Sequence, residues 1–344
     1  MLHIERPSVS SLLAPRQLNT TRLGRCGSPS IPTLIRPRVA CGHLQTIDRP
    51  SPRRSTCMRS TAGKVDVTIQ SNSAQRRSLS YTAYEGNSWE VTFDQSGVTV
   101  LVDPWLEGDL VFANQTWLYR GQKGALKDVK LDIDVIGAHA DVILLSQGLD
   151  DHAHKPTLER LPKDKLVVGS LAAAAVCQSL GFTNVFGLDH DKTMSVCNGK
   201  LQITATAGAL VGPPWSKREN GFVLSETQAD GIKLYYEPHC DYDEAAVARI
   251  GKVDAVVTPA NSQVLINFPL VKGKQNALKL VQSLQPSVVI PLINAQFHQS
   301  GPLSKLIHAE GSPEDLQGLL QHNGLQHVRV RMPAPPGKSF AVTL

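Results

Sequence analysis

Short apolar and alternating runs, separated by turn residues, set the pattern of the chain from Lys64 onward. Hydrophobic and polar residues alternate over Trp89–Phe93, and a second run follows a Gly-containing turn at 98–102, which predicts a β-hairpin. The uninterrupted apolar run Val142–Leu145 predicts a buried strand. Further strands are predicted at 165–168, 184–188, 193–197, 201–205, 221–225, 232–236, 254–258, 287–291, 327–331 and 339–344.

Helices are predicted where capping residues precede amphipathic or Ala-rich segments. Ser170 caps a helix over 172–180 that Gly181 ends, and Ser312 followed by Pro313 begins another that lasts to about residue 321. Two more helices are predicted at 243–250 and 274–284.

The order of these elements contains a loose internal repeat. A hairpin followed by strand–loop–helix units occurs twice, and no linker interrupts residues 64–344. This order predicts one α/β domain made of two similar halves with helices on the outside. Residues 112–138 are left unassigned, and the Gly- and Pro-rich stretch 207–215 is predicted to be irregular.

Charge separates the first sixty residues from the rest of the chain. Residues 1–60 contain ten arginines, no lysine and two acids, so this segment has a net charge of about +8. Because the whole chain has a formal net charge of +5, the remaining residues have a net charge near −3. Together with eight serines and seven prolines, this is typical of an organelle transit peptide, and a disordered basic tail is the alternative. We therefore predict a disordered transit peptide over 1–63, for the chloroplast rather than the mitochondrion, cut near residues 39–41 or 58–64.

Composition excludes several classes of protein. Only 5% of residues are aromatic and the mature part is mildly acidic, so no nucleic-acid partner is indicated. No apolar run approaches the roughly 20 residues of a membrane span. The body contains three isolated cysteines without a C-x-x-C motif, which predicts reduced thiols. Nothing in the sequence indicates the oligomeric state.

The candidate chemistry is concentrated in residues 146–157, S-Q-G-L-D-D-H-A-H-K-P-T, directly after the predicted buried strand. Asp150, Asp151, His152 and His154 thus follow the carboxyl end of a strand, which is a usual place for chemistry in α/β proteins. Asp103 ends the first hairpin before Pro104, where a turn cap is favoured and an acid that supports a neighbouring site residue is the alternative.

Several motifs, in order, resemble the metallo-β-lactamase superfamily, most closely its ascorbate-6-phosphate-lactonase-like branch. N-S-W at 87–89 with L-V-D-P-W-L at 101–106 resembles the opening hairpin, residues 146–157 resemble the T-H-x-H-x-D-H-x-x-x-P-T-L element, and 221–240 resemble the G-F-V-I … Y-x-x-G-D-T element. The resemblance implies a four-layer αββα sandwich, in which two β-sheets are flanked by helices.

The resemblance also implies two divalent metals, but this sequence departs from the ligand pattern. The first two histidines fall on Gln147 and Leu149, and the third falls in Ala209-Leu210, so the first metal site is expected to be lost. The acid and histidine of the second site match Asp151 and His152, and the bridging aspartate falls on His239.

The remaining pattern allows one divalent metal, zinc or iron, with Asp151, His152 and His239 as ligands, and it equally allows no metal. Gln147 or Asn294 would orient a water, while Glu237, Asp103 and His154 are further candidates to hold the metal ligands in place by hydrogen bonds or to contact a substrate. Asn220 is a candidate for substrate contact, although a capping role in a turn is favoured for it. The final histidine of the family motif falls near Asn294.

The same residues allow other interpretations. Asp150 or Asp151 can cap the following segment, His152 and His154 can be polar loop residues, and His239 can be an ordinary strand-end histidine. The expectations are thus a single-metal hydrolase of an ester, lactone or phosphoester, or a non-catalytic, metal-free descendant that binds a small ligand or partner in the old cleft. An iron-dependent redox protein is a third possibility with the same ligands.

Overall fold

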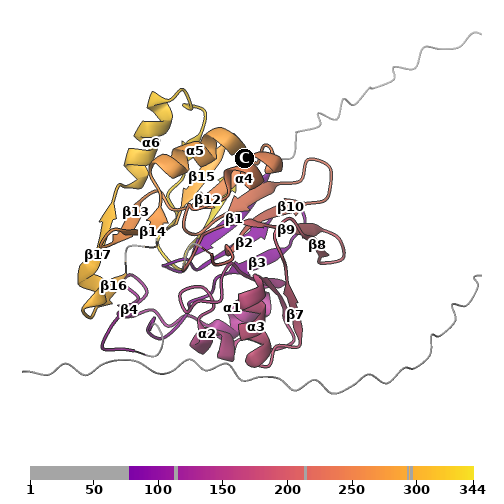
Figure 1. Ribbon diagram of the computed structural model, residues 1–344. Coiled ribbons are helices and arrows are strands. Elements are labelled where there is room, and N and C mark those ends of the chain that lie inside the picture. The colour runs from indigo at the N-terminus through magenta and orange to yellow at the C-terminus, as the bar shows by residue number, and fades with distance from the viewer. Residues whose placement is uncertain (1–76, 112–114, 213–214, 293, 295–296) are drawn as a thin grey trace, which may run out of the picture. The chain divides into compact units, whose positions relative to one another are not determined.

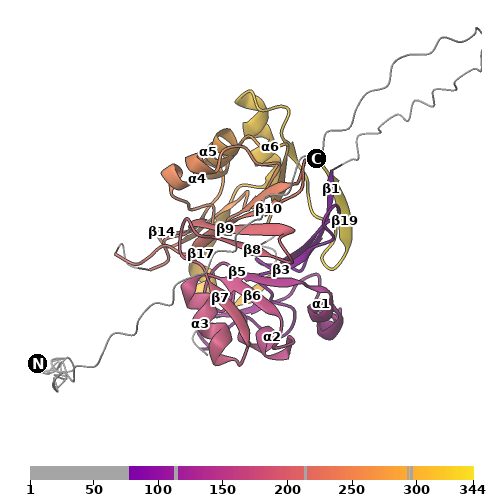
Figure 2. The same ribbon diagram turned by 90° about the vertical axis from the view of Figure 1, so that its right-hand side faces the viewer.

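The computed structural model describes residues 77–111, 115–212, 215–292, 294 and 297–344. The expected transit peptide, residues 1–63, lies outside this range and stays a prediction. In the described part, two seven-stranded sheets lie face to face, and helices cover the outer side of each (Figure 1, Figure 2). The expected αββα order of layers is confirmed.

The first sheet joins an antiparallel half to a parallel half. Its strands β19, β1, β2 and β3 are antiparallel neighbours, whereas β3, β5, β6 and β7 run parallel. Their order and bounds are β19 (Ser339–Thr343), β1 (Ser78–Ala83), β2 (Trp89–Phe93), β3 (Thr99–Val102), β5 (Val142–Leu145), β6 (Leu166–Gly169) and β7 (Asn184–Gly187).

The second sheet repeats this plan. Strands β8 to β11 are antiparallel neighbours, whereas β11, β12, β15 and β18 run parallel. Their order and bounds are β18 (Arg329–Val330), β15 (Val288–Pro291), β12 (Ala255–Thr258), β11 (Lys233–Tyr236), β10 (Asn220–Glu226), β9 (Leu201–Ala207) and β8 (Thr193–Val196). The predicted pair of similar halves therefore corresponds to the two sheets.

The main core lies between the two sheets. Successive side chains of a strand point to opposite faces, so alternate residues of β2 and β11 enter the space between them. Trp89 and Tyr236 meet there edge to face with ring centroids 5.1 Å apart, and Tyr81 stacks on Trp89 at 5.2 Å. Both Leu234 and Tyr236 are fully buried in this cluster.

Two further apolar layers hold the helices on the sheets. One lies between the first sheet and its helices, and the other lies between the second sheet and its helices. The helices are α1 (Ile133–His139), α2 (Lys155–Arg160) and α3 (Leu171–Ser179) on the first sheet, and α4 (Glu244–Ile250), α5 (Gln275–Leu284) and α6 (Pro313–His322) on the second (Figure 2). Among the described residues, no helix is both long enough and apolar enough to cross a membrane.

Two small sheets lie together at one end of this unit (Figure 1). They contain β14 (Phe268–Lys272), β13 (Ser262–Leu265) and β17 (Ile307–Glu310), and β16 (His298–Ser300) with β4 (Arg120–Gln122). A short 3-10 helix, Leu303–Leu306, precedes β17. None of these elements was predicted, because their strands are short and partly exposed and so lack the alternation that marks a half-buried strand.

Most other predicted elements are confirmed to within a few residues. Both hairpins form, as β2–β3 and β10–β11. Ser170 and Ser312 cap α3 and α6, since their hydroxyls accept hydrogen bonds from the backbone N–H groups of Ala173 and Asp315. The unassigned region 112–138 contains β4 and α1, and β1 was missed. The described body cysteines are free, as predicted.

Replacing Leu234 with Ala should lower the free energy of unfolding by about 2–5 kcal/mol, because the change leaves a cavity between the two sheets. Leu234 is fully buried, whereas Val135 on α1 is 62% exposed. The control Val135→Ala should change stability by no more than about 0.5 kcal/mol. Urea denaturation measures both, and similar losses in the two variants would contradict this account of the core.

Candidate metal centre

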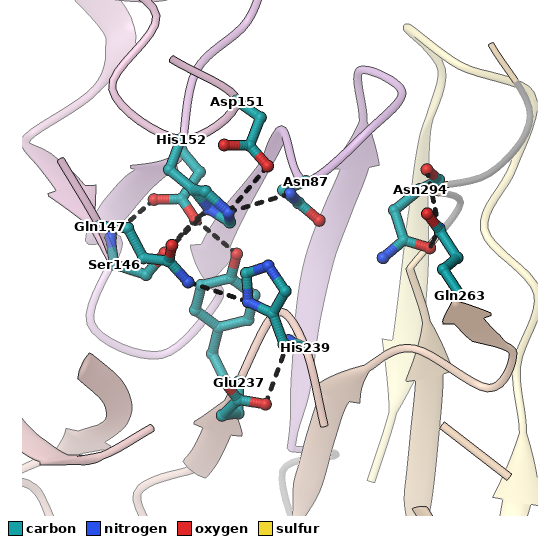
Figure 3. Close-up of polar contacts among 11 residues, drawn as sticks. Asn87, Ser146, Gln147, Asp151, His152, Glu237, His239, Gln263 and Asn294 are labelled. Carbon is teal, nitrogen blue, oxygen red and sulfur yellow. Dashed lines mark hydrogen bonds and ion pairs between the residues drawn. The ribbon is translucent and has the colours of Figure 1, made fainter. Parts of the chain in front are cut away.

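Asp151, His152 and Gln147 of the segment 146–157 lie beside His239 (Figure 3). Asp151 and His152 lie in the loop after β5, and His239 lies in the loop after β11. In the second sheet β11 is the strand at which antiparallel pairing changes to parallel pairing, and in the first sheet β5 is the parallel neighbour of the corresponding strand, β3. The fold thus brings together residues that are 87 or more positions apart, as the resemblance implied.

Asp151, His152 and His239 form a compact group of possible metal ligands. One ligand atom of each lies within 4.8 Å of the others, and this is the one such group of three or more His, Cys, Asp or Glu side chains in the described part of the chain. Nε2 of His152 is 3.3 Å from Oδ2 of Asp151, and the two imidazole centroids are 5.1 Å apart. A metal about 2 Å from each ligand would require a modest closure of the side chains.

His152 is fully buried and held through Nδ1. This nitrogen lies 2.7 Å from Oδ2 of Asp103 and 3.0 Å from Oγ of Ser146. Because a carboxylate only accepts hydrogen bonds, Nδ1 carries a proton and donates it to Asp103. Nε2 then faces Asp151 and the Asn87 amide nitrogen, which is 3.3 Å away. A histidine oriented by a carboxylate in this way presents its second nitrogen to a metal.

The buried carboxylate of Asp103 accepts hydrogen bonds from three other residues, so the favoured interpretation as a turn cap is wrong. Its carboxylate accepts hydrogen bonds from N and Oγ of Ser146 at 2.7 and 2.5 Å, and from Nδ1 of His152. The hydroxyl of Tyr236, on the second sheet, donates to the same carboxylate at 2.7 Å. The side chain is fully buried. Asp103 therefore orients His152 and joins the two sheets.

His239 is positioned by Gln147 and Glu237. Nε2 of Gln147 lies 2.9 Å from Nδ1 of His239. Oε2 of Glu237 accepts hydrogen bonds from the backbone N–H groups of His239 and Asp241 at 3.1 and 2.8 Å, which shapes the turn after β11. Burial raises the pKa of Glu237 to about 8, although these hydrogen bonds oppose the shift. Glu237 thus supports the loop and is not part of the ligand group.

Charge is unevenly shared within the centre. Burial favours neutral His152, but the charges of Asp151 and Asp103 and their hydrogen bonds outweigh it and raise the pKa of His152 to about 10. Burial and the neighbouring His152 lower the pKa of His239 to about 4. Burial opposes ionisation of Asp151, yet His152 brings its pKa below the usual value. Without a metal, one imidazolium lies between two carboxylates, and the second imidazole is neutral.

Three acceptor oxygens around this group have no hydrogen-bond partner although they are buried. They are Oδ1 of Asp151, Oε1 of Gln147 and Oδ1 of Asn87. A buried oxygen without a donor is costly, and each such case in a folded protein calls for an explanation. A cation with its bound water would supply the missing partners. The donor set of one carboxylate and two imidazoles therefore fits a divalent metal such as zinc or iron(II).

Other sequence candidates serve the fold. His154 is buried and caps α2: its Nδ1 accepts from the backbone N–H of Thr157, and its Nε2 lies 3.2 Å from the carbonyl oxygen of Asp109. Asn220 lies within β10, not in a turn, and its amide donates to the carbonyl of Leu188 at 2.9 Å. The expected capping turn at Asn220 is thus wrong. Asp150 pairs with Lys155 at 4.0 Å and does not cap α2.

A pocket of about 230 Å³ opens onto the centre. Asp151, His239 and Asn87 line one part of it, and Asn294 lines another. Asn294 accepts hydrogen bonds from the Gln263 amide, and Figure 3 shows this pair apart from the other labelled side chains. Asn294 is therefore placed to contact a bound ligand rather than to complete the ligand group.

Sequence reasoning missed the roles of Asn87, Ser146 and Tyr236. Asn87 and Ser146 belong to quoted motifs, but nothing local shows that they reach His152. Tyr236 carried one usable signal: it faces the same side of β11 as the buried Leu234, so its hydroxyl had to find a partner inside the sandwich.

Comparison with known proteins identifies the domain. The family model described as "Beta-lactamase superfamily domain" matches residues 80–293. No protein in the curated set matches the chain.

Solved structures share the fold at low sequence identity. A possible metal-dependent hydrolase from Veillonella parvula is 16% identical, with a TM-score of 0.55, over 77% of this chain and 99% of that one. An isothiocyanate hydrolase from Delia radicum gut bacteria is 17% identical, with a TM-score of 0.53, over 77% and 99%. CmlA, a diiron β-hydroxylase from Streptomyces venezuelae, is 14% identical, with a TM-score of 0.51, over 78% and 54%.

The low pKa of His239 predicts a loss of stability in acid for metal-free protein. The folded pKa of about 4 lies below the ordinary 6.5, so the unfolded chain binds more protons between these values. The resulting stabilisation is complete above about pH 6.5 and is lost as the pH falls towards 4. When the pH falls from 7 to 5, this histidine should lower the free energy of unfolding of the unmodified protein by an amount on the order of 1–2 kcal/mol, and His239→Gln should remove this loss.

Urea denaturation of chelator-treated protein at both pH values measures this difference. His322 is exposed at the end of α6, so His322→Gln should keep the pH dependence of the unmodified protein. Equal pH dependence in the unmodified protein and His239→Gln would refute the lowered pKa of His239.

Proposed function

The chain belongs to the beta-lactamase superfamily, and from this premise we propose that it is a hydrolase with a single divalent metal held by Asp151, His152 and His239. The observation that carries the proposal is the convergence of these ligands beside three buried oxygens without partners. The likeness to a possible metal-dependent hydrolase from Veillonella parvula agrees with it.

A single metal is favoured by what occupies the positions of the first site. Gln147 is engaged with His239, and Leu149 is 43% exposed and lines the pocket. Neither side chain adds a thiolate, imidazole or carboxylate to the group. At the positions of the first metal site of the family pattern, Gln147 thus positions His239, and Leu149 forms part of the pocket wall.

The surrounding residues prepare the ligands in a defined protonation state. Asp103 holds one proton of His152 on Nδ1, so Nε2 is the nitrogen that would bind the metal, after it loses the proton it carries in the metal-free protein. For His239 to bind through Nε2, its Nδ1 must carry the proton. A half-turn of the Gln147 amide would bring Oε1, which now lacks a partner, against that Nδ1–H group. Gln147 would then act on His239 as Asp103 acts on His152.

A metal in this group would act as a Lewis acid towards a carbonyl or phosphoryl group and would lower the pKa of water. The chain itself supplies a proton acceptor. Oδ1 of Asp151 faces no donor, while Oδ2 is directed at His152. Asp151 is ionised beside the charged His152 of the metal-free protein and would be ionised as a metal ligand, so Oδ1 can accept the proton of an attacking water. Asn294 lines the same pocket and can orient the substrate.

Iron(II) remains the alternative metal, with redox chemistry in place of hydrolysis. Two imidazoles and one carboxylate also suit non-haem iron. CmlA, the fold neighbour from Streptomyces venezuelae, is a diiron enzyme. A non-catalytic binding protein is the other alternative, and the pairing of His152 with Asp103 and Asp151 favours it, because the imidazolium of His152 offsets part of the charge of the two carboxylates without a metal.

Purified protein should contain about one equivalent of zinc or iron and lose it in Asp151→Asn. The neighbouring Asp150→Asn is the matched control and should retain the metal, because Asp150 pairs with Lys155 instead of facing His152. Elemental analysis and hydrolysis of simple esters measure the two properties. A protein that stays metal-free after growth in excess zinc and iron would refute the proposal and favour a binding role.

We also propose that residues 1–63 direct the protein to the chloroplast, on the strength of their Arg- and Ser-rich, acid-poor composition. A fluorescent reporter fused to residues 1–64 should enter chloroplasts in plant cells. Replacing the ten arginines of this segment by glutamine is the control and should prevent import. A cytosolic signal from the unaltered fusion would refute chloroplast targeting, and a mitochondrial signal would support the runner-up.

A further inference from the structure

The walls of the pocket beside the candidate centre are mainly apolar. Asp151 and His239 are among its polar lining residues. Its other walls include Trp105, Leu110, Leu210, Leu265, Phe268 and Phe297. Phe297 packs edge to face on Trp105 with ring centroids 5.3 Å apart, so part of this wall is a fixed aromatic surface. The pocket is thus suited to an apolar group attached to a reactive polar end.

Charges at the pocket do not favour an anionic ligand. Among the described residues that line it, there is no lysine or arginine. The acidic and histidine side chains among these lining residues are Asp151, His239 and Asp241, and Asp241 is already paired with Arg218 at 3.2 Å and Lys272 at 3.0 Å. A phosphate recognised by protein side chains usually meets Arg or Lys. This pocket therefore favours an uncharged substrate over a phosphoester.

Apolar side chains continue from the pocket to the surface. Phe268 lines the pocket and is 49% exposed, and Ile266 and Leu306 beside it are 64% and 43% exposed. The backbone N–H of Ile266 donates to the carbonyl of Leu306 at 3.1 Å, so these two residues are neighbours. Since the pocket volume of about 230 Å³ is slightly below the usual range, a longer ligand would extend along this rim.

We propose that the substrate is an uncharged acyl ester or lactone with an apolar chain of several carbons. Its carbonyl lies at the Asp151–His239 end, and its chain follows the wall from Leu265 to Phe268. The position of the carbonyl rests on the proposed hydrolase function, whereas the affinity for the chain does not. Hydrolysis adds a water oxygen to the carbonyl carbon and breaks its bond to the ester oxygen, which leaves as an alcohol with a proton.

Displacement of the neutral fluorescent probe N-phenyl-1-naphthylamine from the full chain tests the inference without requiring catalysis. Methyl esters from butyrate to decanoate should displace it with an affinity that rises about four-fold for each buried methylene, with or without chelator. Phenyl phosphate should displace it poorly. An affinity independent of chain length, or displacement by phenyl phosphate as effective as by methyl octanoate, would overturn the proposal.

Two matched variants locate the binding. Phe268→Ser should weaken methyl decanoate binding roughly three- to ten-fold, because it removes apolar contact from the rim. Phe186 on β7 is 44% exposed and does not line the pocket, so Phe186→Ser should bind as the unmodified protein does. Equal affinity in Phe268→Ser and Phe186→Ser would place the chain elsewhere and refute the inference.

The two proposals fail differently. Chain-length-dependent displacement without ester hydrolysis supports the apolar pocket and counts against the hydrolase. Ester hydrolysis accompanied by displacement that ignores chain length supports the hydrolase and overturns the apolar-chain inference.

Discussion

The buried carboxylate of Asp103 joins the two sheets at the edge where the candidate centre lies. It follows β3, receives two hydrogen bonds from Ser146 after β5, and receives another from Tyr236 on β11. An unpaired carboxylate in this position would be prohibitively costly, so the donors around it fix the distance between the sheets at this point. The same carboxylate also orients His152. The contacts of Asp103 that hold the two sheets together therefore also set the orientation of His152.

The centre is a small polar region with apolar surroundings. His152 is enclosed by carboxylates and amides, while Trp105, Leu110 and Phe297 line the adjoining pocket. In such an environment, interactions between charges are strong because little water screens them. This explains why His152 and His239, only 5.1 Å apart, have pKa values shifted in opposite directions. It also explains how one site can combine a charged centre with an apolar ligand.

The two halves of the fold contribute unequally to the site. The first half supplies Asp151 and His152 through the loop after β5, together with their supports Asp103 and Ser146. The second half supplies His239, and it also supplies the small sheet whose Leu265 and Phe268 form the pocket wall. The charged centre thus combines loops from both sheets, whereas part of the ligand pocket comes from strands added to the second half.

The sequence by itself determined an α/β domain of two similar halves, both hairpins, the buried strand β5 and the caps at Ser170 and Ser312, because these depend on local periodicity and turn chemistry. The αββα order of layers came from motif resemblance. The sequence also indicated Asp151, His152 and His239 through motif resemblance. Only the tertiary structure decided the roles of Asp103, Tyr236 and Gln147, because their partners are distant in the sequence. Gln147 is 92 residues from His239, Tyr236 is 133 residues from Asp103, and Asp103 is 49 residues from His152. Long-range contacts of this kind leave no local pattern. The small strands β13, β14 and β17, which wall the pocket, were hidden for a related reason: pairing with one another, rather than burial of one face, holds them in place.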